Sequence, residues 1–134
     1  MNRENLLKAK RKDNGEWVEG YYVFCRKHHY ILPILTEAIG YDEREGEWIE
    51  INPDTLCRHT GFTDKNGKEV WENDIVRNEK GDIGVVQWFE EHAAFMIWNK
   101  TKHYVCYLAE NDFSKIEIAG NEFDNPELLE VEHE

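Results

Sequence analysis

The sequence predicts an all-β fold, built as a barrel or a sandwich. Runs rich in Val, Ile, Tyr, Phe and Trp, the residues that strands favour, follow one another along most of the chain. Polar turn segments that contain Gly, Asn and Asp separate these runs. Helix signals are confined to the two ends of the chain. Short strands joined by tight turns are typical of small barrels and sandwiches, so we expect strands to enclose the core.

The first part of the chain is expected to form antiparallel strands. Residues 13–15, Asp-Asn-Gly, have the composition of a turn, and strand formers dominate the run that follows. Residues 2–12 have a propensity that also suits a helix, but we predict a strand that pairs with residues 16–24. Residues 29–35 are apolar, and Pro33 restricts them to an edge strand or a bent strand because proline lacks a backbone N–H.

Residues 60–76 carry the strongest hairpin signal, Asn66-Gly67 between two strand-like runs. A two-residue loop would place Asp64 opposite Glu69, and two like charges at such a position destabilise a sheet. A three-residue loop instead pairs Asp64 with Lys68, begins a type I turn with Asp, and gives Gly67 the left-handed position. We therefore expect the three-residue loop, with the Asp64 side chain capping the turn backbone.

The second half of the chain is expected to continue as strands, with a different element only at its end. The predicted strands are residues 74–78, 83–89, 93–100, 102–109 and 114–120. At the end, Asn125 suits the N-cap of a helix, Pro126 suits its first position, and glutamates follow in the first turn. We therefore predict that residues 121–134 form an acidic tail with a short helix.

Composition limits the partners of this protein. The chain has 134 residues, 40% of them apolar, which suffices for a packed core, and a net charge of −12. Residues 1–30 carry seven basic and four acidic side chains, whereas residues 31–134 carry a net charge of −15. So acidic a chain repels nucleic acid unless a basic patch is segregated on one face, and residues 8–12, "KAKRK", are the candidate.

Cysteine usage and hydropathy predict a cytoplasmic protein without a membrane segment. Cys25, Cys57 and Cys106 are odd in number and far apart, without a CxxC motif, which is typical of reduced thiols. No stretch approaches the length of a membrane span, and the N-terminus lacks the apolar core of a signal peptide.

Two short clusters of Cys and His could supply zinc ligands: Cys25, His28 and His29 in one, Cys57 and His59 in the other. Their spacing is irregular for a zinc site, and the first cluster falls within a predicted strand. We interpret them as buried thiols and surface histidines. No pattern of nucleophile, base and orienting acid stands out either, so we predict no metal, no cofactor and no catalytic residue.

Aromatic side chains are abundant, and four of them are candidates for a ligand platform: Trp48, Trp71, Trp88 and Trp98. Exposed aromatics on small barrels stack on bases or hold proline-rich peptides. Small barrels also need large side chains to fill their interiors, so we expect a core or subunit-interface position for each of these residues.

Three motifs give the chain a family resemblance. They are "RKDNGEWVEGYYV" at residues 11–23, "TGFTDKNGKEVWENDIV" at 60–76 and "IAGNEFDNPELLE" at 118–130. In this order the sequence resembles the YopX family, small proteins of bacteriophages and prophages of Gram-positive bacteria. Family members usually read Gly-Asp-Ile-Val where this chain has Asn73 before Asp74, and Asn tolerates the left-handed conformation that Gly would supply. They also tend to have Leu at the position of Phe62.

The resemblance implies a fold and a source but no reaction. Residues 60–120 are expected to form an SH3-like barrel, and residues 1–59 an irregular β region used for self-association. The protein is then a phage or prophage accessory protein in the cytoplasm of a bacterial host. We expect it to act without catalysis, by binding an unidentified host or phage protein and by forming a homo-oligomer.

Candidate contact residues follow from these expectations. The predicted oligomer interface consists of Trp17, Tyr21, Tyr22, Phe24, Ile31, Leu32 and Leu35. The alternative function is that of a nucleic-acid-associated factor, which net charge disfavours. It would use Lys8, Lys10, Arg11 and Lys12 as an electrostatic foot and barrel aromatics as the stacking surface.

Overall fold

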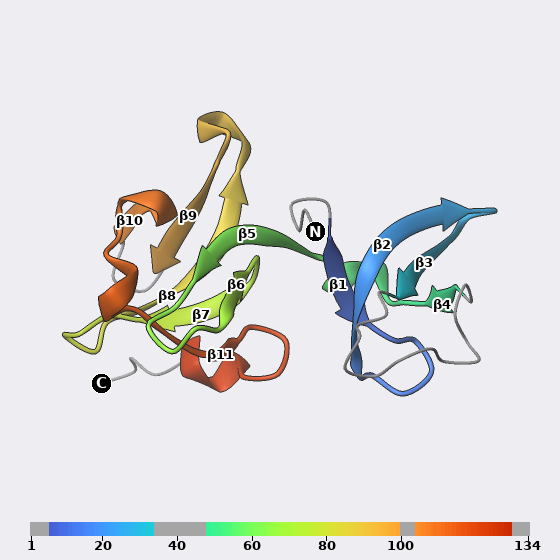
Figure 1. The fold of residues 1–134 in the computed structure, drawn as a ribbon, viewed down its shortest axis with the longest axis horizontal. Coiled ribbons are helices and arrows are strands. Elements are labelled where there is room, and N and C mark those ends of the chain that lie inside the picture. Colours follow the sequence, from blue (N-terminus) through green and yellow to red (C-terminus); the bar gives the residue numbers. More distant parts are fainter. Residues whose placement is uncertain (1–5, 34–47, 100–103, 130–134) are drawn as a thin grey trace. The chain divides into compact units, whose positions relative to one another are not determined.

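Antiparallel strands build the protein, as a computed structural model that describes residues 6–33, 48–99 and 104–129 shows (Figure 1). The predicted all-β class is confirmed, because the helical segments within those ranges are short 3-10 turns. They are η1 Pro53–Thr55, η2 Glu90–His92, η3 Leu108–Glu110, η4 Phe113–Lys115 and η5 Pro126–Leu129. The chain divides into two compact units, unit 1 (residues 1–59) and unit 2 (residues 60–134).

The described strands of unit 1 belong to one sheet. Its strands are β1 Leu7–Lys10, β2 Trp17–Cys25, β3 His28–Pro33, β4 Ile49–Glu50 and the first residues of β5 Cys57–Thr63, in the order β4-β3-β2-β1-β5. The predicted pairing of the first strand with residues 16–24 is confirmed, with Ala9 opposite Val18. Strand β3 pairs with β2 on one side and with β4 on the other. In the described residues β4 pairs only with Tyr30 and Ile31, so Pro33 lies outside the β3–β4 ladder.

The core of unit 1 forms where the ends of β1 and β4 meet. An isolated bridge joins Arg11 to Ile51, and the backbone N–H of Asn52 donates to the carbonyl of Lys10 at 2.9 Å. The sheet therefore curls until its two sides contact each other. Ala9, Ile31 and Ile51 are buried inside this curl, packed with the partly exposed residues Val18, Tyr22 and Leu56.

The hairpin at residues 60–76 has the predicted three-residue loop. It joins the last residues of β5 to β6 Glu69–Trp71. The backbone N–H of Asp64 donates to the carbonyl of Lys68 at 2.8 Å, and Gly67 has a φ of 82°. The Asp64 carboxylate accepts from the backbone N–H groups of Asn66 and Lys68, both at 2.9 Å. The predicted left-handed Asn73 is also confirmed, with a φ of 75°.

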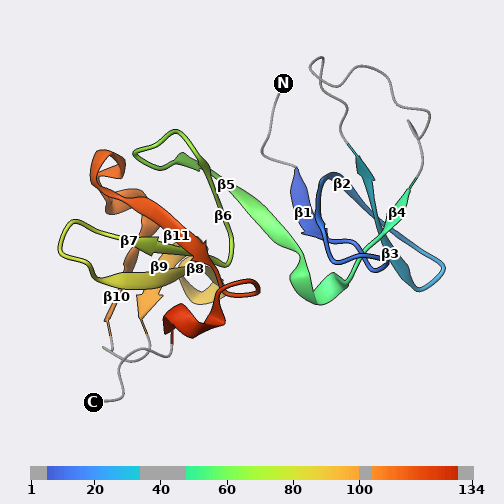
Figure 2. The same ribbon diagram turned by 90° about the horizontal axis from the view of Figure 1, so that it is seen from below.

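The sheet of unit 2 contains β7 Asp74–Arg77, β8 Ile83–Phe89, β9 Ala94–Asn99, β10 Tyr104–Tyr107 and β11 Glu117–Asn121. Their order is β10-β9-β8-β7-β11, so the last strand lies beside the first (Figure 2). Between β10 and β11 the chain passes through the 3-10 turns η3 and η4.

The hydrophobic core of unit 2 lies between this sheet and the β5–β6 hairpin. It consists of Val70, Val76, Val86, Ile97, Leu108 and Ile116. Phe62 and Phe113 stack at its edge, with ring centroids 4.6 Å apart. Side chains from the hairpin, the sheet and η3 therefore share one interior, which is the arrangement that the alternating pattern of the strands requires.

Two details of this part differ from the expectation. Among the described strands β10 and β11 do not pair with each other, so backbone hydrogen bonds leave this sheet open where we expected a barrel. The predicted C-terminal helix is a single 3-10 turn, η5, as far as the structure describes it. Asn125 instead uses its side-chain oxygen to accept from the backbone N–H of Asn121 at 3.1 Å.

Candidate interaction surfaces

The sheet of unit 1 separates the predicted interface residues onto two faces. Tyr22 lies opposite Ile31 on the face that forms the core, where Ile31 is fully buried. Tyr21 lies opposite Leu32 on the other face, because successive residues of a strand point to opposite sides. Trp17 shares the parity of Tyr21 and lies on that second face. A single interface cannot use all of these residues without opening the core.

We call this second face the outer face and define it by Trp17, Tyr21, Val23, Tyr30, Leu32 and Trp48. Tyr21 is 44% exposed and Trp48 is 49% exposed, which is high for residues of this size. The Trp48 and Tyr30 rings contact each other at 5.6 Å. The interface prediction lacked Val23, Tyr30 and Trp48, although a period of two along the hairpin would have selected Val23 and Tyr30.

Phe24 and Leu35 complete the predicted set. Phe24 has the parity of the core face, but it lies near the end of the β2–β3 hairpin and is 59% exposed. Its ring contacts that of His29 at 4.8 Å. Leu35 lies outside the described residues.

The cations of the predicted basic run, residues 8–12, have two kinds of partner: an aromatic ring and carboxylates. The Lys8 and Lys10 ammonium groups lie over the Trp17 ring, 4.7 and 5.5 Å from its centroid. Arg11 forms an ion pair with Asp13 at 2.8 Å, and Lys12 one with Glu50 at 3.3 Å. Carboxylates therefore offset the charges of Arg11 and Lys12, two cations that a nucleic-acid site would use.

An open cavity of about 810 Å³ lies beside this run. Lys10, Lys12, Lys27 and His28 line it, together with Glu50. His28 Nδ1 lies 2.9 Å from the Glu50 carboxylate. The hydrogen bond from His28 and then that from Lys12 lower the pKa of Glu50, so a carboxylate charge lies beside the Lys12 ammonium group in this cavity.

The candidate zinc residues have other neighbours. Cys25 lies opposite His28 across the β2–β3 hairpin, while His29 hydrogen-bonds to the Tyr22 hydroxyl. Cys57 is buried, and its thiol donates to the carbonyl of Thr55 at 3.3 Å. Among the residues that the structure describes, no three His, Cys, Asp or Glu side chains gather as a metal site would require.

Unit 2 carries a second group of aromatic residues, on the opposite side of its sheet from Val86 and Ile97. Val85 and Met96 on that same side are buried, and the exposed rings there are those of His92 and Tyr107. Phe89 contacts Trp98 at 6.1 Å and His92 at 6.3 Å, and His92 contacts Tyr107 at 5.7 Å. We call Phe89, His92, Trp98 and Tyr107 the ring chain. Trp98 was a candidate for a ligand platform, whereas Trp71, another candidate, is buried.

These features define a two-unit, all-β protein whose sheets carry exposed aromatic side chains, among them Tyr21, Trp48 and Tyr107. Within the described residues no helix has the length and apolarity to cross a membrane. The chain belongs to the YopX family, since the family described as YopX protein matches residues 7–130. A comparison with curated proteins finds no match.

Proposed function

We propose that the protein is a phage or prophage accessory protein that acts by binding and self-association in the bacterial cytoplasm, without catalysis. Membership of the YopX family supports the source. The outer face of unit 1 supports the mode of action, and it is the observation that carries the proposal. Tyrosine and tryptophan, which dominate this face, are enriched at protein interfaces because they combine a large apolar area with a polar group.

A second copy of the chain is the proposed occupant of the outer face. Tyr21 and Leu32 form one cross-strand pair, and Val23 and Tyr30 form the next, so apolar groups are contiguous across two strands. Trp48 extends this strip through its contact with Tyr30. Burying such side chains against a partner removes apolar surface from water, which yields roughly 25 cal/mol per Å² before the costs of association.

Size-exclusion chromatography with light scattering tests this proposal at micromolar concentrations. Tyr21→Glu introduces a charge at the centre of the strip and is expected to convert the oligomer into a monomer. Tyr21→Phe keeps the ring and is the matched control, which should retain the wild-type mass. A monomeric wild-type protein would refute self-association, and an unaffected Tyr21→Glu variant would place the contact elsewhere.

For unit 2 we propose an SH3-like barrel. The strand order β10-β9-β8-β7-β11 supports it, because the final strand pairs with the first strand of a meander. The 3-10 turns η3 and η4, between the fourth and fifth strands of that series, support it as well. A nuclear magnetic resonance structure of the full chain tests this proposal. Long-range contacts across the open side, between β10 and β11, are expected, and a flat sheet would contradict the barrel.

Nucleic-acid binding is the second candidate function, and the Lys8–Trp17–Lys10 arrangement favours it. A tryptophan ring beside two ammonium groups offers stacking and phosphate attraction in one place. Unit 2 opposes this function, since it carries seven basic and seventeen acidic residues. This candidate predicts that single-stranded DNA quenches the tryptophan fluorescence of the protein. Quenching that decreases with rising salt, and that the Lys8→Ala/Lys10→Ala variant loses, would support it. No quenching at low salt would exclude it.

A further inference from the structure

The turn between β2 and β3 is strained and cationic. Its two central residues are Arg26, with a φ of 52°, and Lys27, with a φ of 69°. Two-residue hairpin turns of this kind favour Asn-Gly, because most other side chains clash in the left-handed conformation. This chain uses Asn-Gly at residues 66–67 yet places two long cations here. Backbone strain that a sequence retains at an exposed turn is a reason to look for a contact made by its side chains.

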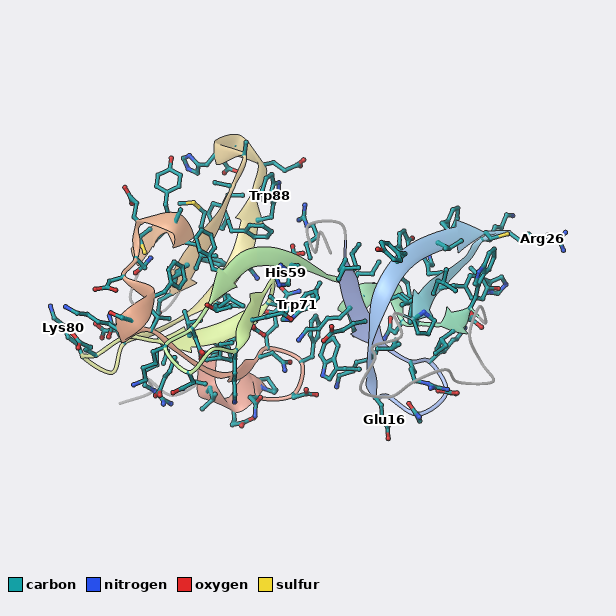
Figure 3. The ribbon with its side chains drawn as sticks, in the orientation of Figure 1. Glu16, Arg26, His59, Trp71, Lys80 and Trp88 are labelled. Carbon is teal, nitrogen blue, oxygen red and sulfur yellow. The ribbon has the colours of Figure 1, made fainter. Side chains whose placement is uncertain are left out.

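The turn also presents its side chains to solvent. Arg26 and Lys27 are both exposed, and Figure 3 shows Arg26 extending outward from the end of the hairpin. Within the described parts of the chain neither cation has a carboxylate partner. Phe24, two residues before Arg26, is more than half exposed. We call Phe24, Arg26 and Lys27 the tip. It joins one aromatic ring and two cations in a small protruding element.

The ring chain of unit 2 is complementary to the tip, because it combines exposed aromatic rings with acidic side chains. Tyr107 is 39% exposed, and Val105, beside it on the same face, is 49% exposed. Glu90 and Glu91 in η2 lie between Phe89 and His92 in the sequence, Glu110 in η3 follows Tyr107 by three residues, and all three are exposed. Residues 81–99 and 104–114, which include all members of the ring chain, contain no Lys or Arg. Aromatic faces with nearby carboxylates attract cations, and arginine stacks on such rings while pairing with the carboxylates.

We propose that the tip of one copy binds the ring chain of a second copy, with Arg26 and Lys27 against Glu90 and Glu91. Charge complementarity identifies a second copy as the occupant. Unit 2 has a net charge of −10 and unit 1, with nine basic and eleven acidic side chains, one of −2. The complementary charges are therefore local: the two exposed cations of the tip, and the exposed carboxylates of Glu90 and Glu91. This contact rests on the proposed self-association, but it is distinct from the outer face. It joins two different surfaces, so it is heterologous and yields rings or chains of subunits.

Sedimentation velocity of the full chain, in about 50 mM and about 500 mM sodium chloride, tests the contact because salt screens exposed charges. At low salt we expect species larger than the outer-face dimer, and at high salt the dimer alone. Arg26→Asn/Lys27→Gly is the decisive variant. It replaces the strained residues with those that the turn favours, so it should raise the melting temperature while abolishing the larger species. Misfolding therefore cannot account for a loss of assembly.

A second experiment reverses the charges on the two proposed contact surfaces. Glu90→Arg/Glu91→Arg and Arg26→Glu/Lys27→Glu should each lose the larger species at low salt, and a mixture of the two variants should recover them. Lys80→Glu/Lys115→Glu changes the net charge as much as the tip reversal does, at exposed positions of unit 2, and should behave as wild type. A mixture that stays dimeric, or larger species that persist without the tip, would overturn the contact.

These measurements distinguish a failure of the tip contact from a failure of the outer-face interface. A wild-type protein that is dimeric at both salt concentrations overturns the tip contact and leaves the outer face intact. Salt-sensitive species that Tyr21→Glu does not reduce, but Arg26→Asn/Lys27→Gly does, overturn the outer face and leave the tip contact intact. A poly-arginine peptide provides one more outcome. If it binds at Glu90 and Glu91 but the protein never forms the larger species, the ring chain binds a different cationic partner and the proposal is wrong.

Discussion

The Asp64 carboxylate accepts a hydrogen bond from the backbone N–H of Ile118, 54 residues further along the chain, at 2.9 Å. The same carboxylate holds the turn of the β5–β6 hairpin through Asn66 and Lys68. One buried side chain therefore closes a local turn and attaches that turn to β11. The backbone N–H of Lys65, which donates to the carbonyl of Ile116 at 2.9 Å, reinforces the attachment.

Removing this carboxylate should destabilise unit 2. Asp64→Ala leaves three backbone N–H groups without their acceptor, and each hydrogen bond to a charged group contributes about 1.5–3 kcal/mol. Because the losses are not additive, we expect a decrease of about 3 kcal/mol in the free energy of unfolding. Urea denaturation measures it. Asp64→Asn retains one oxygen acceptor and should lose less, and equal losses in the two variants would contradict this account.

The stability that Asp64 provides should depend on pH. Burial alone would raise the pKa of Asp64, but the hydrogen bonds from Ile118, Lys68 and Asn66 outweigh burial and hold it below its ordinary value of 3.8. A carboxyl whose pKa is lower in the folded state stabilises the fold above its unfolded pKa and loses that contribution as the pH falls through the folded pKa. The difference in unfolding free energy between wild type and Asp64→Asn should therefore be constant near neutral pH and shrink below about pH 4.

Glu122 should show the opposite dependence. Burial and then the nearby charge of Glu72 raise the pKa of Glu122 above its ordinary value of 4.5. Ionised Glu122 therefore opposes folding, and its cost appears as the pH rises through the unfolded and then the folded pKa. Glu122→Gln should stabilise the protein at pH 7 by about 0.5 kcal/mol, the usual scale for a surface substitution. Thermal unfolding at pH 7 and at about pH 4 checks this, since the gain should vanish at the lower pH.

The turns of this protein were predictable because their signals are local. Asp64 at the start of the turn, Gly67 in the left-handed position and Asn73 in place of glycine each depend on neighbours within a few residues. The bond from Asp64 to Ile118 was not predictable. No local pattern states which distant N–H a buried carboxylate will meet, because that choice depends on how the hairpin packs against β11.

Which residues share a candidate surface is determined by strand register, and residue type alone does not predict it. Tyr21 and Tyr22 are chemically identical, yet one lies on the outer face and the other packs against the core. Placing them requires knowing that the β2–β3 turn consists of Arg26 and Lys27, and these residues give no turn signal. A cationic pair in a left-handed turn contradicts propensity, so sequence reasoning passes over the element that sets the register of the hairpin.

Two glycines within strands should differ in their tolerance of alanine. A Cβ at Gly20 would lie 2.0 Å from the Leu32 carbonyl oxygen, which belongs to the paired strand β3 and cannot move without breaking the ladder. A Cβ at Gly84 would lie 2.6 Å from the Ile97 Cγ2 methyl and 3.2 Å from the Trp98 carbonyl oxygen, so its nearest obstacle is a side chain. We expect Gly20→Ala to cost about 3 kcal/mol or more and Gly84→Ala about half as much, because overpacking a side chain costs about 1–3 kcal/mol. Chemical denaturation of both variants measures the two costs, and a larger loss for Gly84→Ala would show that the β2–β3 ladder yields more easily than the core of unit 2.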